Sequence, residues 1–229
     1  MSDGGTKHRH IPYQPERLSA DETLSRGQAF FDELNARRSV RYFSDDPVPR
    51  AAIEHAVRTA STAPSGAHRQ PWRFVAIDDP GLKAQIRVAA EAEEKLSYEG
   101  GRMPPEWLDA LAPLGTTWEK PYLETVPHIV VLFEEIRSFD ADGEPRKNYY
   151  VRESVGIAAG MFITALHHMG LATLTHTPSP MGFLTELLGR PKHERPFILF
   201  PIGYPAADAT VPDIQRKPLD EVLVWNATK

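Results

Sequence analysis

Cysteine is absent from the 229 residues of this chain. Without a thiol the protein forms no disulfide, no thiolate zinc site and no iron–sulfur cluster, and it has no cysteine nucleophile. Its chemistry must therefore rest on oxygen and nitrogen side chains or on a bound cofactor. The same absence leaves the redox compartment open, because a chain without thiols is chemically stable in any of them.

Long apolar runs and an excess of positive charge are also missing. No stretch reaches the roughly 18 apolar residues of a membrane span, and the polar start Met1–Arg9 has no apolar signal-peptide core. We therefore expect a soluble, cytoplasmic protein with no membrane partner. Lys and Arg number 26 against 31 Asp and Glu, a formal net charge of −5. This balance argues against nucleic acid as a partner, because phosphate backbones favour basic surfaces.

Proline and apolar residues are plentiful. The 21 prolines predict turns and extended arms rather than a simple helical bundle, and 41 % apolar residues suffice for a sizeable core. We expect a flexible arm at 1–18 and an extended arm at about 205–229. His8 and His10 lie in the first arm without acidic or cysteine neighbours, so we interpret them as part of a solvated tail and predict no metal site.

Helical spacing of apolar residues predicts helices, and compact apolar runs predict strands. Ser19 and Glu22 form a capping box that opens the first helix. The segment 149–169 is nearly all apolar and reads as a buried central helix, where Gly156 and Gly160 leave room for another helix to approach. The alternation of elements predicts an α+β fold around one sheet. The expected helices cover 19–35, 49–60, 80–97, 107–111, 149–169 and 184–188, and the expected strands cover 72–77, 126–133, 171–175 and 197–203.

Standard catalytic signatures are missing. The chain has no phosphate-binding G-x-x-x-x-G-K-[ST] loop, no H-E-x-x-H zinc motif and no G-x-S-x-G nucleophile elbow. Its glycines form no dinucleotide fingerprint, because Gly156 and Gly160 lie inside a helix. Ser65 and His68 stand close together on a turn, which gives only weak support to a serine hydrolase.

Three segments nevertheless carry unusual chemistry. Residues 37–41 (Arg-Arg-Ser-Val-Arg) place three arginines at a helix-to-strand junction, which fits either a solvated basic patch or an anion site with bidentate Arg contacts. Residues 63–68 (Ala-Pro-Ser-Gly-Ala-His) form a turn of small residues, where a flat ligand could approach the backbone closely. Residues 175–178 (Thr-His-Thr-Pro) end a strand, where hydroxyls either line a ligand cleft or serve the turn.

Together the three segments resemble the flavin-binding elements of the nitroreductase superfamily, and the similarity is closer to the iodotyrosine deiodinase family within it. The resemblance covers about residues 24–224, and its motifs are collinear. It rests on 37–42, on 62–68 with Pro71-Trp72, on 122–127, on 188–191, and on 209–213 with 216–220. It implies a nitroreductase-like fold, with a central mixed, mainly antiparallel sheet flanked by helices. It further implies an intertwined homodimer with FMN at the subunit interface, a single FMN domain over 19–229 and a lid at about 91–121.

The resemblance also implies which residues bind FMN. The arginines would offset the phosphate dianion and fix its direction, and the Thr177 hydroxyl would contact flavin N5. It assigns catalytic positions to Thr177 and Ser65. The matching cofactor positions are Arg37, Arg38, Ser39, Val40, Arg41, Pro64, Ser65, Thr175, His176, Thr177 and Arg216.

The implied substrate is a halogenated tyrosine bound as a zwitterion. By similarity Glu94 takes the ammonium group, Lys120 takes the carboxylate, and Tyr98 serves either through its hydroxyl. The backbone N–H of Ala67 would meet the phenolate oxygen. Glu94 and Tyr98 stand four residues apart, on one helix face. Taken singly, Glu94 and Lys120 would read as solvated surface charges, and the segment 100–117 departs from the pattern of the animal enzymes.

The sequence thus predicts an FMN-dependent reductive dehalogenase that removes iodide, bromide or chloride from halotyrosines. One alternative is a general nitroreductase that uses NAD(P)H and needs no zwitterion clamp. Another is a flavin-binding protein without turnover. Animal members of the family carry an N-terminal membrane anchor, and the polar start of this chain leads us to expect a form without one.

Overall fold

The computed structural model describes residues 8–226, and the chain divides into two units at the junction of Ala36 and Arg37. The first unit contains helix α1 (Ala20–Asn35). The Ser19 hydroxyl accepts a hydrogen bond from the Glu22 backbone N–H at 3.2 Å, which confirms the predicted helix start. No residue of α1 is buried, and its Leu24, Phe30 and Phe31 side chains are exposed.

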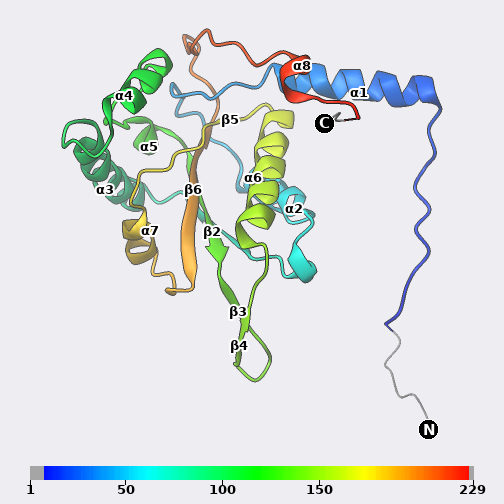
Figure 1. Ribbon diagram of the computed structural model, residues 1–229. Coiled ribbons are helices and arrows are strands. Elements are labelled where there is room, and N and C mark those ends of the chain that lie inside the picture. Colours follow the sequence, from blue (N-terminus) through cyan, green and yellow to red (C-terminus); the bar gives the residue numbers. More distant parts are fainter. Residues whose placement is uncertain (1–7, 227–229) are drawn as a thin grey trace. The chain divides into compact units, whose positions relative to one another are not determined.

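The second unit is built on a four-stranded sheet in the order β1-β2-β6-β5 (Figure 1). All three strand pairs are antiparallel. A single parallel bridge joins Ser39 to Thr173 at the edge of the sheet, and it brings the arginine-rich segment 37–41 beside β5. The strands are β1 (Trp72–Ile77), β2 (His128–Glu135), β5 (Ala172–Thr173) and β6 (Glu194–Gly203).

Helices cover both faces of this sheet (Figure 1). Helices α2 (Arg50–Ala60) and α6 (Val151–His168) pack on one face. Helices α3 (Pro80–Tyr98), α5 (Tyr122–Thr125) and α7 (Gly182–Leu187) pack on the other. The sheet lies between two apolar clusters, as expected for an α+β fold with layers on both sides.

Strand β2 shows how the sequence specifies these two layers. Successive side chains of a strand point to opposite faces. Val130 and Leu132 accordingly join the cluster under α2 and α6, whereas Ile129, Val131 and Phe133 join the cluster under α3 and α7. Because both faces are covered, β2 reads as an unbroken apolar run rather than an alternating one.

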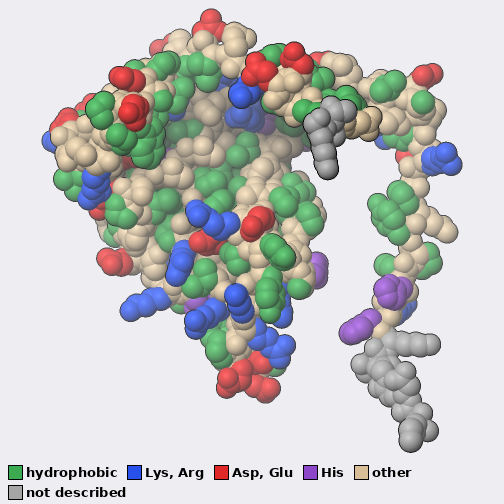
Figure 2. Space-filling model, viewed as in Figure 1, with side chains coloured by type: hydrophobic (Ala, Val, Ile, Leu, Met, Phe, Trp, Pro, Cys, Tyr) green, Lys and Arg blue, Asp and Glu red, His purple; other side chains and the backbone are tan. Residues whose placement is uncertain are grey.

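A hairpin lies within 136–148, a stretch for which the sequence predicts neither a helix nor a strand. Strand β3 (Arg137–Phe139) pairs antiparallel with β4 (Pro145–Lys147), and the hairpin extends beyond the end of the sheet (Figure 1). Acidic side chains gather at its tip and basic side chains around its base (Figure 2). The remaining elements are the short helices η1 (Gly66–His68), α4 (Pro105–Leu111), η2 (Ala112–Leu114) and α8 (Leu219–Val222).

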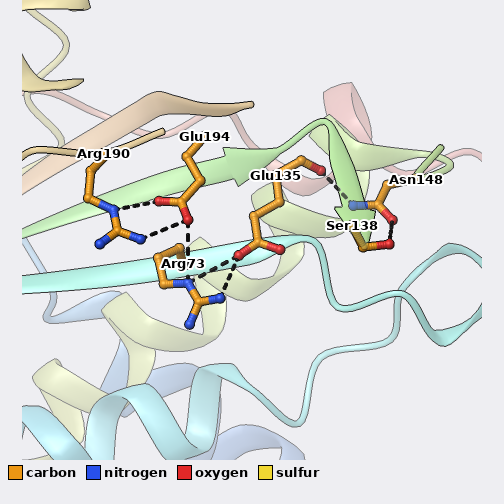
Figure 3. A network of polar contacts seen from close by, with 6 residues as sticks. All are labelled: Arg73, Glu135, Ser138, Asn148, Arg190 and Glu194. Carbon is orange, nitrogen blue, oxygen red and sulfur yellow. Dashed lines mark hydrogen bonds and ion pairs between the residues drawn. The ribbon is translucent and has the colours of Figure 1, made fainter. Parts of the chain in front are cut away.

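A polar network fixes the end of the sheet from which this hairpin starts (Figure 3). The buried carboxylate of Glu194 receives two hydrogen bonds from Arg190, at 2.7 and 2.8 Å, and lies 3.8 Å from Arg73. Arg73 also pairs with Glu135 at 2.9 Å. The Asn148 amide donates to the Glu135 carbonyl at 2.8 Å and so ties the base of the hairpin to β2.

Within residues 8–226 the structure contains no helix that is both long and apolar enough to cross a bilayer. Helix α6 buries Val155, Ala158, Phe162 and Leu166 against the sheet. It is therefore the central helix that the sequence predicts.

Candidate functional site

A cavity of about 680 Å³ lies between the end of α3, the segment before α5 and the strand end that follows β5. The cavity collects side chains that are far apart in the sequence. The predicted site residues that line this cavity are Arg41, Glu94, Tyr98, Lys120, Thr175, His176 and Thr177.

Glu94 and Lys120 form a buried ion pair in this cavity. Glu94 is 8 % exposed and Lys120 is 2 % exposed, and Lys120 Nζ lies 3.4 Å from Glu94 Oε2. The Lys120 ammonium also lies 5.4 Å from the centre of the Tyr98 ring. Because Glu94 and Tyr98 are one helical turn apart on α3, a single helix face presents both. The structure therefore brings together the three predicted substrate-binding side chains.

Further contacts hold Lys120 in this position. Its ammonium donates hydrogen bonds to the Thr117 carbonyl and, at 3.3 Å, to the Thr116 hydroxyl. Its backbone N–H donates to Glu91 Oε1 at 2.7 Å. Lys120 is thus held by both its main chain and its side chain, and the segment before α5 is tied to α3 at two neighbouring carboxylates.

Opposing effects set the ionisation of this pair. Burial disfavours charge on Glu94, but the hydrogen bond with His176 and the charge of Lys120 outweigh it, so the pKa of Glu94 lies below its ordinary value. Burial lowers the pKa of Lys120, and the nearby Glu94 carboxylate counteracts this. Burial likewise raises the pKa of Tyr122, whose phenol lines the same cavity in its protonated form.

A second cavity, of about 290 Å³, adjoins the first at Arg41, which lines both. Arg37, Arg38, Ser39 and Arg216 also line it, and no Asp or Glu from the described part of the chain does so. Burial lowers the pKa of Arg37, and the neighbouring charges of Arg216 and Arg38 lower it further. A cavity lined by arginines whose charges repel one another, and by no carboxylate of the described chain, is suited to an anion.

Hydrogen bonds to backbone carbonyls hold the two chain segments of this arginine cluster together. Arg216 donates to the Arg37 carbonyl at 3.0 Å, and Arg38 donates to the Pro212 carbonyl, so the C-terminal segment closes over residues 37–41. The Arg41 Nε is buried and has no hydrogen-bond partner in the described part of the chain. An orphaned guanidinium N–H beside the cavity is the feature expected where a phosphate oxygen binds. The residues present therefore fit a phosphate-bearing cofactor such as FMN.

Val40 differs from its neighbours in this cluster. Its side chain is buried in the apolar core, and its backbone N–H donates to the Thr173 carbonyl at 3.3 Å. Neither its side chain nor its N–H points to a ligand. Val40 instead fixes the direction of the chain, so that Ser39 and Arg41 on either side of it both face the cavity.

The turn that carries Pro64, Ser65 and Ala67 lines neither cavity. It packs on the N-terminus of α6, where the Gly66 N–H donates to the Ser154 hydroxyl at 3.2 Å. A Cβ at Gly66 would lie 2.6 Å from the Tyr149 carbonyl oxygen, so this close approach requires glycine. Within one chain, the structure does not bring this turn together with the other predicted site residues.

Other lining residues were not predicted. Met103, Trp107 and Leu111 from the region of α4 face the first cavity, together with Tyr122 from α5. The spacing of Trp107 and Leu111 indicates a short helix with one apolar face. The apolar face of this helix is the sequence feature that marks these residues, because a Trp on a short helix after two prolines has no core of its own to cover.

Comparisons with known proteins agree with this geometry. The nitroreductase family model matches residues 34–204. An iodotyrosine deiodinase of Haliscomenobacter hydrossis is 52 % identical over 218 residues, which are 95 % of this chain and 98 % of the relative. Human iodotyrosine deiodinase 1 is 45 % identical over 216 residues, 94 % of this chain and 74 % of that protein.

A solved structure is similar over most of its length. The crystal structure of an oxidized iodotyrosine deiodinase bound to FMN and 3-iodo-L-tyrosine superposes with a TM-score of 0.72 at 33 % identity, covering 87 % of this chain and all of that one (100 %). The family match spans the sheet, the ion pair and the arginine segment. This chain belongs to the nitroreductase family and, within it, to the iodotyrosine deiodinases.

Proposed function

We propose that this protein is an FMN-dependent reductive dehalogenase that removes iodide, bromide or chloride from halogenated tyrosines such as mono- and diiodotyrosine. The observation that carries the proposal is the buried Glu94–Lys120 pair, which shares one cavity with the strand-end hydroxyls Thr175 and Thr177. Such a pair can receive an amino-acid zwitterion. The relatives named above are iodotyrosine deiodinases, which supports the same assignment.

The arginine cluster and the strand end at 175–177 would hold the cofactor. Arg37, Arg38, Arg41 and Arg216 neutralise the phosphate, with Ser39 beside them. Thr175 and Thr177, both exposed, present hydroxyls from the strand end to the isoalloxazine ring. When bound, FMN supplies the two electrons that, with a proton, replace the carbon–halogen bond by a carbon–hydrogen bond and release halide.

The ion pair would bind the substrate by exchange of partners. The substrate ammonium replaces Lys120 at Glu94, and the substrate carboxylate replaces Glu94 at Lys120, so every buried charge keeps a partner. A ligand without an ammonium group leaves the Glu94 carboxylate without a positively charged partner at Oε2. Truncating one member of a buried pair costs about 3–5 kcal/mol, so zwitterions are strongly selected over ligands that carry one charge.

Lid residues complete this recognition. We assign the lid to about 91–121, which includes the end of α3, α4 and Lys120. Tyr98 lies beside the Lys120 ammonium, and its phenol can hydrogen-bond the ammonium or the carboxylate of the substrate. Trp107 would cover the cavity from α4 and exclude water from the bound ring.

We further propose that the active form is a homodimer with FMN at the subunit interface. Helix α6 leaves Gly156, Gly160 and Ile157 exposed on the side away from the sheet, and hydrophobic side chains reach the surface over this helix (Figure 2). Small residues at i and i+4 allow a second helix to approach closely, which supports an α6 contact between subunits.

Extended apolar segments and the 63–68 turn also support a dimer. The C-terminal arm, 205–229, exposes Ile214, Val224 and Trp225, a pattern that suits a segment embracing a partner chain. Pro64, Ser65 and Ala67 lie away from both cavities of their own chain, beside the N-terminus of α6. We assign them to the flavin and phenolate contacts of the partner's site, across the α6 interface.

Anaerobic mixing tests the proposed activity. The FMN-loaded protein is reduced with dithionite under titration to the end point and mixed with diiodotyrosine, while absorbance of the oxidised flavin and released iodide are followed. We expect flavin reoxidation together with iodide and tyrosine formation, and no reoxidation by tyrosine itself. Reoxidation by nitroaromatics but not by diiodotyrosine would instead indicate a general nitroreductase. Reduction without reoxidation by any halotyrosine would indicate a flavin-binding protein without turnover.

A further inference from the structure

The strand end at 175–177 presents alternate side chains to different surroundings. Thr175 and Thr177 are exposed, whereas His176 between them is 5 % exposed. A bridge between His176 and Leu199 keeps this segment extended, with backbone hydrogen bonds of 2.9 Å in both directions. Successive side chains of an extended segment point to opposite sides. The His176 ring therefore leaves the side of the threonines and enters the protein.

The His176 ring meets the carboxylate of the ion pair described above. Its Nε2 lies 3.4 Å from Glu94 Oε1, while Lys120 Nζ lies 3.4 Å from the other oxygen, Oε2. The Tyr122 ring packs edge-on against the imidazole, with 6.1 Å between the ring centres. Each oxygen of Glu94 thus has its own partner, one from the lid and one from the strand end.

The protonation of His176 is consistent with donation to Glu94. Burial lowers its pKa, and this outweighs the opposite effect of the Glu94 carboxylate, while the charges of Lys120 and Arg41 lower it further. A neutral imidazole has one N–H, and donation from Nε2 to a carboxylate places it there. The Nδ1 is then an acceptor, and it is buried without a hydrogen-bond partner among residues 8–226. A ring nitrogen left unpaired in this way is unusual in a core and points to a function for the ring.

We propose that His176 is a positioning residue for Glu94 and thereby selects ligands that carry an ammonium group. This inference rests on the proposed function, because it assumes that Glu94 receives the substrate ammonium. When the ammonium replaces Lys120 at Oε2, the His176 contact at Oε1 is unaffected and keeps the carboxylate pointing into the cavity. His176 also links the lid to the strand end whose neighbouring threonines face the flavin side.

The test uses three variants of the FMN-loaded full chain. His176→Leu removes the donor and keeps a buried apolar side chain, whereas His176→Gln keeps an N–H near the position of Nε2. His128→Gln is the matched control, because His128 is also buried but its Nε2 donates to the Val48 carbonyl, 2.7 Å away, and it lines neither cavity of the site. Quenching of FMN fluorescence is titrated with diiodotyrosine and with its analogue that lacks the amino group.

We expect His176→Leu to raise the Kd of diiodotyrosine about tenfold, the effect of losing one hydrogen bond to a charged group, and to change that of the des-amino analogue little. His176→Gln should restore most of the affinity, and all variants should retain FMN. Equal losses for both ligands, or no loss for either, would overturn the positioning role. If the wild-type protein itself does not respond to diiodotyrosine, the proposed function fails instead, so the two failures are distinguishable.

Discussion

Removing the two charges of the buried pair, singly and together, is the most informative perturbation that the structure suggests. Glu94→Gln and Lys120→Met each keep the approximate size of the side chain and delete one charge. The double variant deletes both and leaves no uncompensated ion. Stability and ligand binding should therefore respond differently across the three variants.

The magnitude follows from the separation and the burial of the pair. At 3.4 Å, with the effective dielectric constant of about 20 that describes protein sites, the Coulomb energy is about 5 kcal/mol. Desolvation offsets part of it, and Thr116, Thr117 and His176 partly satisfy whichever partner is left. We expect each single variant to lower the free energy of unfolding by about 2–3 kcal/mol. The double variant should cost no more than one single variant, which gives a coupling energy of about 2 kcal/mol.

Urea denaturation measures the free energy of unfolding of each variant. The protein concentration is fixed and FMN is saturating, so that cofactor binding and subunit association contribute equally to every variant. Fluorescence quenching by diiodotyrosine measures binding in the same preparations. All three variants should bind diiodotyrosine at least about 100-fold more weakly, because the loss of a charged partner exceeds 2.7 kcal/mol on the scale of about 1.4 kcal/mol per factor of ten.

Additive stability costs in the double variant would refute the reasoning, since they would mean that Glu94 and Lys120 do not sense each other in the folded protein. Retained diiodotyrosine binding in the double variant would refute the exchange of partners on binding. Loss of FMN from any variant would show that the pair also supports the cofactor site, which the geometry does not predict.

Three further predictions concern other parts of the site. Gly66→Ala places a Cβ 2.6 Å from the Tyr149 carbonyl oxygen, so a urea titration should show a loss of about 2 kcal/mol or more, whereas Gly27→Ala, in open space on α1, should not be destabilised. Arg41→Gln should weaken FMN binding about 10- to 100-fold in fluorescence titrations, because it removes a charge-assisted contact to phosphate; unchanged affinity would exclude Arg41 from the arginine cluster that binds FMN. Because the pKa of Glu94 lies below its ordinary 4.5, its contribution to stability is complete above pH 4.5 and declines as the pH falls through the folded-state pKa. The pH dependence of urea midpoints should therefore be flatter below pH 4.5 in Glu94→Gln than in wild type.

Much of the fold could be predicted where one physical pattern dominates. Helix α6 and strand β2 are long apolar segments with clear limits, and the structure confirms both. Helix α2 begins at Arg50 rather than at Pro49, which caps it instead. The β3–β4 hairpin was missed because its strands are three residues long and charged, so pairing geometry rather than hydrophobicity stabilises it.

The sequence predicts which residues form the site, but it does not predict the direction in which their side chains point. The arginine segment and the lid pair came from motifs, and the structure collects them in adjoining cavities. The direction of the Val40 side chain and the contact of His176 with Glu94 depend on which face of an extended segment meets the core. A motif records residue types in order and carries no information on that face.

The arginine cluster makes the stability of the folded protein depend on the concentration of its cofactor. No Asp or Glu of the described chain lines the cavity, and the charges of Arg216 and Arg38 lower the pKa of Arg37. The segment from Arg37 to Arg41 is therefore least favourable when no anion is bound. Any ligand that binds only the folded protein stabilises it, by about 4 kcal/mol at a concentration 1,000 times its Kd. Variants whose folded state is only marginally stable would thus remain folded in cells rich in flavin and be degraded in cells that lack it. The abundance of this protein would then depend on the cofactor concentration in the cell as well as on the expression of its gene.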